Sequence, residues 1–204
     1  SHRESFEGAS VFDDGDYETP LGTVEVDQEI NEELKKNEEF VFSSFPHLDE
    51  HSIEVQIPFL QFHLKKKFKI VPIIIGTQDY LICKKISEVL KKYFNNKNLF
   101  VISSDFSHYP NYNDAADIDY NTVNAICSGK VENLVQTIKS NSEKKVKNLC
   151  TSLCGYTSVL TLMYMTEQMK NAEYKILKYM NSGDADPNKK DKVGVRVFCR
   201  GVFP

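Results

Sequence analysis

Apolar and polar residues alternate in short blocks along the first part of the chain, and this pattern predicts strands and helices in turn. Residues 23–26 and 40–43 are predicted to be strands because they are short and mostly β-branched or aromatic. Between them, Asp27 is a good N-cap for a helix that carries Ile30 and Leu34 on one face. A mixed α and β architecture is therefore expected from the start of the chain.

Residues 50–64 place apolar side chains three or four positions apart, which predicts a helix. Pro58 must either kink this helix or lie in its first turn. Residues 70–75 and 99–103 are nearly continuous apolar runs that predict strands buried on both faces. A helix opened by Asp79 is expected between them, which gives a βαβ unit with a right-handed crossover. Pro72 favours an edge or bulge position.

The second half predicts a polar loop at 105–113, helices at 115–127, 131–140 and 155–170, and strands at 174–180 and 193–203. Residues 181–188 are expected to form a loop between the last two strands. The predicted fold class is therefore α/β, with a central mixed, partly parallel β-sheet flanked by helices on both faces. The length of 204 residues predicts a single domain over residues 1–204.

Composition and charge narrow the classes of function. The formal net charge of −4 argues against nucleic acid as a partner. No window of 18 apolar residues is present, so membrane insertion is not expected. Five cysteines, an odd number, and no signal peptide predict reduced thiols and a cytoplasmic location.

Candidate chemistry is concentrated in residues 103–109, where hydroxyls, Asp105 and His108 follow the predicted strand. A histidine there can act as a base or a metal ligand, and a carboxylate can orient it. Alternatively, Ser104 and Asp105 only close a turn. Cys154 precedes a predicted helix, where the helix dipole favours a thiolate, although a small buried residue is the simpler explanation from the residues alone.

Glu50 and His51 open the predicted 50–64 helix, where acidic side chains either complement the helix dipole or contribute to a site. His47, in a predicted loop, and His63, beside a lysine run, are expected to have no functional role.

Four blocks of the sequence together resemble the Memo family. They are the segments Asp49-Glu50-His51-Ser52-Ile53-Glu54, Ile70-Val71-Pro72-Ile73-Ile74-Ile75-Gly76, Ser103-Ser104-Asp105-Phe106-Ser107-His108-Tyr109 and Cys154-Gly155-Tyr156. They occur in the family's order and at its spacing, and the resemblance covers essentially the whole chain. It implies a fold like that of the class III extradiol ring-cleavage dioxygenases.

The resemblance also implies a metal pocket holding iron or copper through two histidines and a cysteine. Its residues map to His2 and Cys154, with His108 and Asp105 as the catalytic pair and Glu50, His51 and Ser104 lining the pocket. The family's other metal-ligating histidine has no counterpart in this chain. We therefore expect the family's N-terminal segment to be missing, leaving an unpaired sheet edge or an exposed apolar face.

Three functions follow from the resemblance and the residues. The first is a metal-dependent, oxidoreductase-like protein. The alternative is a signalling adaptor that binds phosphotyrosine-type peptides at the same pocket, so that the partner is a peptide or a small-molecule ligand. The third is a hydrolase that uses the Asp105-x-x-His108 spacing or a pair formed by Cys154 and His108. The sequence names no substrate, settled reaction or oligomeric state.

Overall fold

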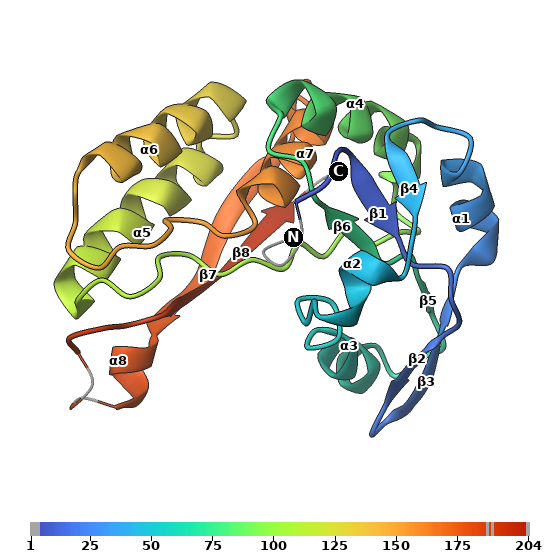
Figure 1. Ribbon diagram of the computed structural model, residues 1–204, viewed down its shortest axis with the longest axis horizontal. Coiled ribbons are helices and arrows are strands. Elements are labelled where there is room, and N and C mark those ends of the chain that lie inside the picture. Colours follow the sequence, from blue (N-terminus) through green and yellow to red (C-terminus); the bar gives the residue numbers. More distant parts are fainter. Residues whose placement is uncertain (1–4, 187, 189, 203–204) are drawn as a thin grey trace. The chain divides into compact units, whose positions relative to one another are not determined.

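The chain forms two compact units, residues 1–103 and residues 104–204 (Figure 1). The structure, a computed structural model, describes residues 5–186, 188 and 190–202, and it describes only the backbone of residues 195–202. Each unit has its own strands and helices. The prediction of a single family domain over all 204 residues stays a prediction.

A small mixed sheet forms the centre of the first unit. Its strand order is β4-β1-β6, with β1 at Ala9–Val11, β4 at Phe40–Phe42 and β6 at Ile73–Ile75. Strand β1 runs parallel to β4 and antiparallel to β6. The side chains of Ala9 and Val11 are fully buried. The middle strand of this sheet is therefore part of the buried core of the unit.

The apolar run at 70–75 forms two strands rather than the single strand predicted. Strand β5 (Lys69–Ile70) continues a second sheet, ordered β2-β3-β5, which contains β2 at Tyr17–Thr19 and β3 at Gly22–Val26. Strand β6 begins at Ile73 and belongs to the first sheet. The break falls at Pro72, which has no N–H for a ladder, while its carbonyl accepts from Phe12 N–H at 3.1 Å.

Two helices of the first unit begin at the predicted aspartates. Helix α1 spans Gln28–Leu34, and the Asp27 side chain accepts from Ile30 N–H. Helix α4 spans Tyr80–Leu90 and continues into the short 3₁₀ helix η1 at Lys91–Tyr93. The Asp79 side chain accepts from Leu81 N–H at 2.7 Å. Both caps are confirmed, because an aspartate before an apolar-periodic run satisfies a helix amide that otherwise lacks a partner.

The predicted helix at 50–64 is wrong in its first half. A short helix α2 spans Phe45–Leu48, residues 52–56 form turns, and helix α3 occupies only Ile57–Leu64. Pro58 lies in the first turn of α3, one of the two placements expected. A proline in that position clashes with a helical turn before it, so α3 starts there. Phe59 and Phe62 on α3 are each 74% exposed.

The strand predicted at 99–103 does not form. These residues have no regular secondary structure, and Leu99 and Val101 are 69% and 44% exposed. A strand needs a neighbouring backbone to pair with, and within the described residues no strand pairs with this segment. The expected βαβ crossover is therefore absent from the described chain.

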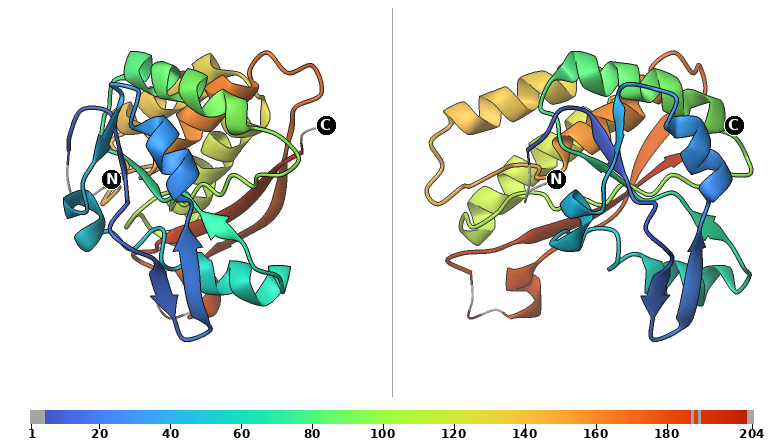
Figure 2. Two further views of the ribbon diagram at one scale, coloured as in Figure 1. Left: turned by 90° about the vertical axis from the view of Figure 1, so that its right-hand side faces the viewer. Right: turned by 45° about the vertical axis from the view of Figure 1, so that its right-hand side comes forward.

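The second unit combines helices with one antiparallel ribbon. Helices α5, α6 and α7 span Tyr112–Cys127, Val131–Glu143 and Tyr156–Thr166. Strands β7 (Glu173–Asn181) and β8 (Val195–Val202) form the long antiparallel pair visible in Figure 2. Between them lies the single-turn helix α8 (Ser182–Ala185), so the predicted loop at 181–188 begins with a helical turn.

The architecture is mixed α/β, as predicted, and the pairing includes both parallel and antiparallel strands. The described strands divide among three small sheets rather than forming one central sheet. In the described part of the chain, no helix combines the length and apolar character needed to cross a lipid bilayer.

Substitution of Gly8 tests whether close backbone packing between Gly8 and Glu39 stabilises the start of β1. Its φ of +87° suits glycine, and an added Cβ would collide with the carbonyl oxygen of Glu39. Gly15 has a similar φ of +94° but open space around it. Gly15→Ala should therefore lower the free energy of unfolding by only about 1–2 kcal/mol. Gly8→Ala should lower it by clearly more, as measured by urea denaturation, and equal losses would contradict this account.

Candidate functional site

Residues 104–109, here named the His108 loop, are held in the second unit by backbone hydrogen bonds to two other segments. Cys154 N–H donates to the Asp105 carbonyl at 3.0 Å, and His108 N–H donates to the Thr151 carbonyl at 3.1 Å. On the other side, Tyr109 N–H donates to the Val193 carbonyl at 2.8 Å. The loop lacks regular secondary structure, yet its backbone is fixed at several points.

The Cys154 sulfur lies against the first residues of this loop. Its Sγ accepts a hydrogen bond from Asp105 N–H at 3.2 Å and lies 3.7 Å from Ser104 Oγ. Ser104 Oγ also accepts from Gly155 N–H at 2.9 Å, where α7 begins. Amide N–H groups directed at a sulfur stabilise negative charge on it. A cysteine sulfur in this position is chemically able to act as a nucleophile or as a soft metal ligand.

The two ring nitrogens of His108 differ in their surroundings: one hydrogen-bonds to a backbone carbonyl, and the other faces a carboxylate. Its Nδ1 lies 2.8 Å from the Phe106 carbonyl oxygen, which can only accept, so Nδ1 carries the proton in the neutral ring. Its Nε2 is then the basic nitrogen, 4.0 Å from a carboxylate oxygen of Asp105. The imidazole is therefore oriented to accept a proton at Nε2.

Tyr109 completes the exposed side of the site. Its φ is +72°, which is costly for an aromatic residue, and its side chain is 55% exposed. Its ring packs edge-on against the His108 ring, with centroids 5.8 Å apart. A large, partly exposed aromatic surface thus lies beside the His108 ring.

Asp119 on α5 is a site residue that the sequence analysis missed. It is fully buried, and its Oδ1 accepts from Ser107 N–H at 2.9 Å while its Oδ2 accepts from Tyr179 Oη at 3.0 Å. Burial raises the pKa of this carboxyl to about 6, although the hydrogen bonds oppose the rise. A signal was present, because Asp119 lies at helical spacing among the buried positions Ala115, Ile118 and Thr122.

Ser104, Asp105, His108 and Cys154 lie near one another in the structure, while their roles as site residues stay a prediction. Glu50 and His51 belong to the first unit. Glu50 Oε1 accepts from Ser52 N–H at 3.1 Å and lies 3.8 Å from His51 Nδ1. His2, the other predicted metal ligand, lies outside the described residues. Among the residues that are described, no group of three or more His, Cys, Asp and Glu side chains could hold a metal ion.

His47 in the first unit lies on helix α2 rather than in the predicted loop. It is buried on α2, and its ring packs against Phe12 with centroids 5.3 Å apart. Neither ring nitrogen has a hydrogen bond of good geometry among the described residues, although the Ser10 backbone lies close enough to favour the charged ring. Burial lowers the pKa of the His47 imidazole to about 4, which outweighs the upward effects of the Ser10 backbone and of nearby carboxylates such as Glu50. The ring is therefore neutral at physiological pH.

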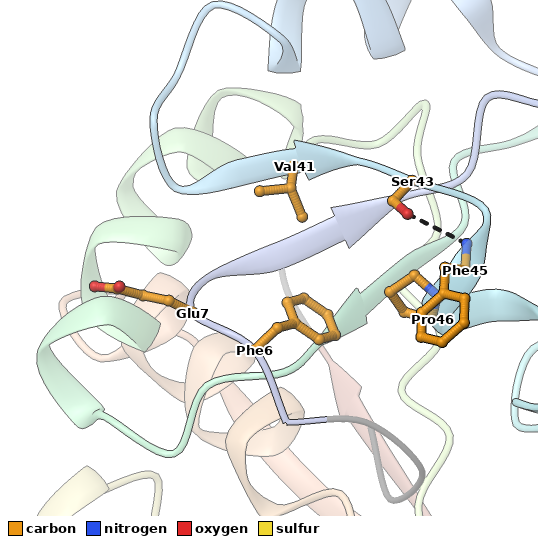
Figure 3. A pocket seen from close by; sticks show the side chains of 6 residues that line it. All are labelled: Phe6, Glu7, Val41, Ser43, Phe45 and Pro46. Atoms are coloured by element: carbon orange, nitrogen blue, oxygen red, sulfur yellow. Dashed lines mark hydrogen bonds between the residues drawn. The ribbon is translucent and has the colours of Figure 1, made fainter.

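Two cavities lie away from the predicted residues. One of about 330 Å³ in the first unit is lined by Phe6, Glu7, Val41, Ser43, Phe45 and Pro46. Figure 3 shows the Phe6 ring directed toward Pro46, and the only dashed contact joins Phe45 N–H to Ser43 Oγ. A second, of about 460 Å³, lies between α5 and α6 and is lined mainly by amide and hydroxyl side chains. Neither cavity gathers the titratable groups that the His108 loop provides.

Comparisons with known proteins agree with the motifs. The family model described as Memo-like protein matches residues 1–198. A MEMO1 family protein of Thermoplasma volcanium is 31% identical over 205 residues, covering 99% of this chain and 72% of the relative. One from Sulfolobus acidocaldarius is 34% identical over 189 residues, covering 91% of this chain and 63% of the relative. The chain thus spans roughly two thirds of the length of these relatives.

The pKa of His47 predicts how stability depends on pH. Between pH 6.5 and about 4 the unfolded chain binds a proton at this imidazole that the folded chain does not. The free energy of unfolding should therefore fall as pH falls through this window, by at most about 3 kcal/mol from this group. Urea denaturation of His47→Leu should show a flatter pH dependence. The exposed His63→Leu serves as control, and a slope unchanged in His47→Leu would refute the assignment.

Proposed function

The chain belongs to the Memo family, and on this premise we propose that the His108 loop and Cys154 form a redox-type pocket. In it, His108 transfers protons and Cys154 helps to hold iron or copper. The observation that carries the proposal is that one loop directs Asp105 N–H at the Cys154 sulfur and also leaves His108 Nε2 available as a base. A thiolate and a base are thereby supported by the same short segment.

The donor chemistry fits a soft or redox-active metal only in part. The half-buried sulfur of Cys154 is the type of donor that such metals prefer. The described residues do not complete a three-ligand set, so His2 and a further donor would have to join Cys154. A bound metal would supply the electron transfer, whereas the described side chains supply proton transfer and charge stabilisation.

The proton step follows from the hydrogen bonds of His108. The ring takes a proton at Nε2 while Nδ1–H remains on the Phe106 carbonyl oxygen, so the ring need not reorient. The resulting imidazolium would be stabilised by the Asp105 carboxylate, whose oxygen lies 4.0 Å from Nε2. This is the arrangement of a general base with an adjacent carboxylate.

The contacts of Cys154 and His108 do not favour the third hypothesis, a hydrolase that uses these two residues as nucleophile and base. The sulfur of Cys154 contacts Asp105 N–H and Ser104 Oγ, whereas the His108 ring contacts the Phe106 carbonyl and faces Asp105. A thiol nucleophile needs a base in hydrogen-bond reach, and these two side chains are each directed to other partners.

Metal analysis tests the proposal directly. The purified protein should contain iron or copper, and Cys154→Ser should lower that content at least about tenfold because a thiolate donor is lost. His2→Ala should have a similar effect. Cys150→Ser is the matched control, since Cys150 is an exposed cysteine four positions away and should leave the metal content unchanged. Equal metal content in Cys154→Ser and the wild type would reject the proposal.

A second candidate function, peptide binding, is favoured by Tyr109. Its half-exposed ring beside His108 provides an aromatic surface of the kind that anchors partner side chains. In this alternative the same loop is a binding site for a phosphotyrosine-type peptide and carries out no reaction.

Calorimetric titration distinguishes the two functions. If the alternative holds, a phosphotyrosine peptide should bind saturably, and Tyr109→Ala should raise Kd at least about tenfold. Tyr120→Ala, a change at another exposed tyrosine of the same unit, should have little effect. The titration is run with and without added metal, and a lack of saturable binding in both conditions would remove this candidate.

A further inference from the structure

One peptide group lies between the buried carboxylate of Asp119 and the ring of His108. The N–H of Ser107 donates to Asp119 Oδ1 at 2.9 Å. The carbonyl of Phe106 accepts from His108 Nδ1 at 2.8 Å. This N–H and this carbonyl are the two ends of the same peptide unit. The two hydrogen bonds therefore form a continuous chain from carboxylate to imidazole.

A peptide group can transmit the electrostatic effect of a charge at its N–H to its carbonyl oxygen, because the N, C and O atoms share delocalised electrons. A negative charge at the N–H end draws the hydrogen toward it and increases the partial negative charge on the carbonyl oxygen. That oxygen then becomes a better acceptor, since hydrogen bonds in a chain polarise one another. The effect is greatest where water is excluded, and here Ser107 is fully buried and Phe106 is 4% exposed.

We propose that Asp119 is a positioning residue that acts on His108 through the Phe106–Ser107 peptide group, keeping the proton on Nδ1 and leaving Nε2 as the base. The inference rests on the proposed function in one respect, the role of His108 as a proton acceptor. It goes beyond that function by adding Asp119 on α5, which hydrogen-bonds the far end of the Phe106–Ser107 peptide group. Asp119 thereby controls which ring nitrogen of His108 acts as the base.

The groups around Asp119 are consistent with this role. Tyr179 on β7 donates to its second oxygen at 3.0 Å, and this tyrosine ring stacks against Tyr120 with centroids 5.2 Å apart. Both oxygens of Asp119 are thus fixed, one by each donor. His108 favours the ionised carboxylate, and Asp184 is a further charged group near Tyr179. Because its pKa is about 6, Asp119 is mainly ionised at neutral pH, when the relay is needed.

Nitrogen-15 NMR of the whole chain tests the relay without requiring a substrate or a metal. At pH 7.5 the neutral wild-type ring of His108 should be mainly the Nδ1–H form. Asp119→Asn should lower the ratio of the Nδ1–H to the Nε2–H form at least about threefold, because a neutral amide polarises the peptide less than a carboxylate. Asp117→Asn is the matched control, since it removes the same charge from an exposed position on the same helix. Its tautomer ratio should equal that of the wild type.

The wild type supplies a second test that does not depend on a variant folding. The Ser107 amide proton should move upfield as pH is lowered through about 6, when Asp119 becomes neutral. A Ser107 resonance that does not titrate, or an unchanged tautomer ratio in a folded Asp119→Asn, would overturn the relay. Metal content is independent of both readouts. A protein that lacks metal but shows the tautomer change would therefore refute the metal proposal and support the relay.

Discussion

The candidate site depends on backbone hydrogen bonds that fasten the His108 loop to the segment before α7. The loop buries one large apolar side chain, that of Phe106, and its remaining residues are held in place chiefly by hydrogen bonds. The bonds from Cys154 N–H to the Asp105 carbonyl and from His108 N–H to the Thr151 carbonyl supply that constraint. They also explain how Tyr109 keeps its costly positive φ, because the surrounding bonds over-determine its backbone. Without them, sulfur, imidazole and carboxylate would not share a location.

Burial shifts the pKa values of two buried titratable residues, Asp119 and His47, in opposite directions. It raises the pKa of Asp119 and lowers that of His47, since in both cases the charged form loses hydration. The difference lies in the partners. Asp119 receives hydrogen bonds from Ser107 and Tyr179 that compensate its charge, whereas the ring nitrogens of His47 receive none of good geometry among the described residues. The surroundings of Asp119 therefore accommodate its ionised carboxylate, whereas those of His47 favour the neutral imidazole.

The local structure was predictable where short-range chemistry decides it. Asp27 and Asp79 cap the helices they were expected to cap, and the helices of the second unit begin within a few residues of their predicted starts. The strand predicted at 99–103 failed because pairing depends on distant residues that an apolar run does not specify. Ser104, Asp105, His108 and Cys154 were selected from the sequence motifs, and the structure places them near one another. Asp119 was not selected, although its helical spacing with Ala115, Ile118 and Thr122 placed it on the buried face of α5, because acidic side chains usually face solvent.

The strand break at Pro72 affects how the first unit unfolds. Ile70 pairs in the β2-β3-β5 sheet and Ile73 pairs in the β4-β1-β6 sheet, so only Val71 and Pro72 separate the strands of two different ladders. The link is too short to let one ladder separate while the other stays intact, because a residue of extended chain spans only about 3.3 Å. Unfolding of either sheet therefore disrupts the other, and the two sheets unfold cooperatively. Local opening should accordingly begin at the outer helices of this unit, and its two sheets should exchange their amide hydrogens together.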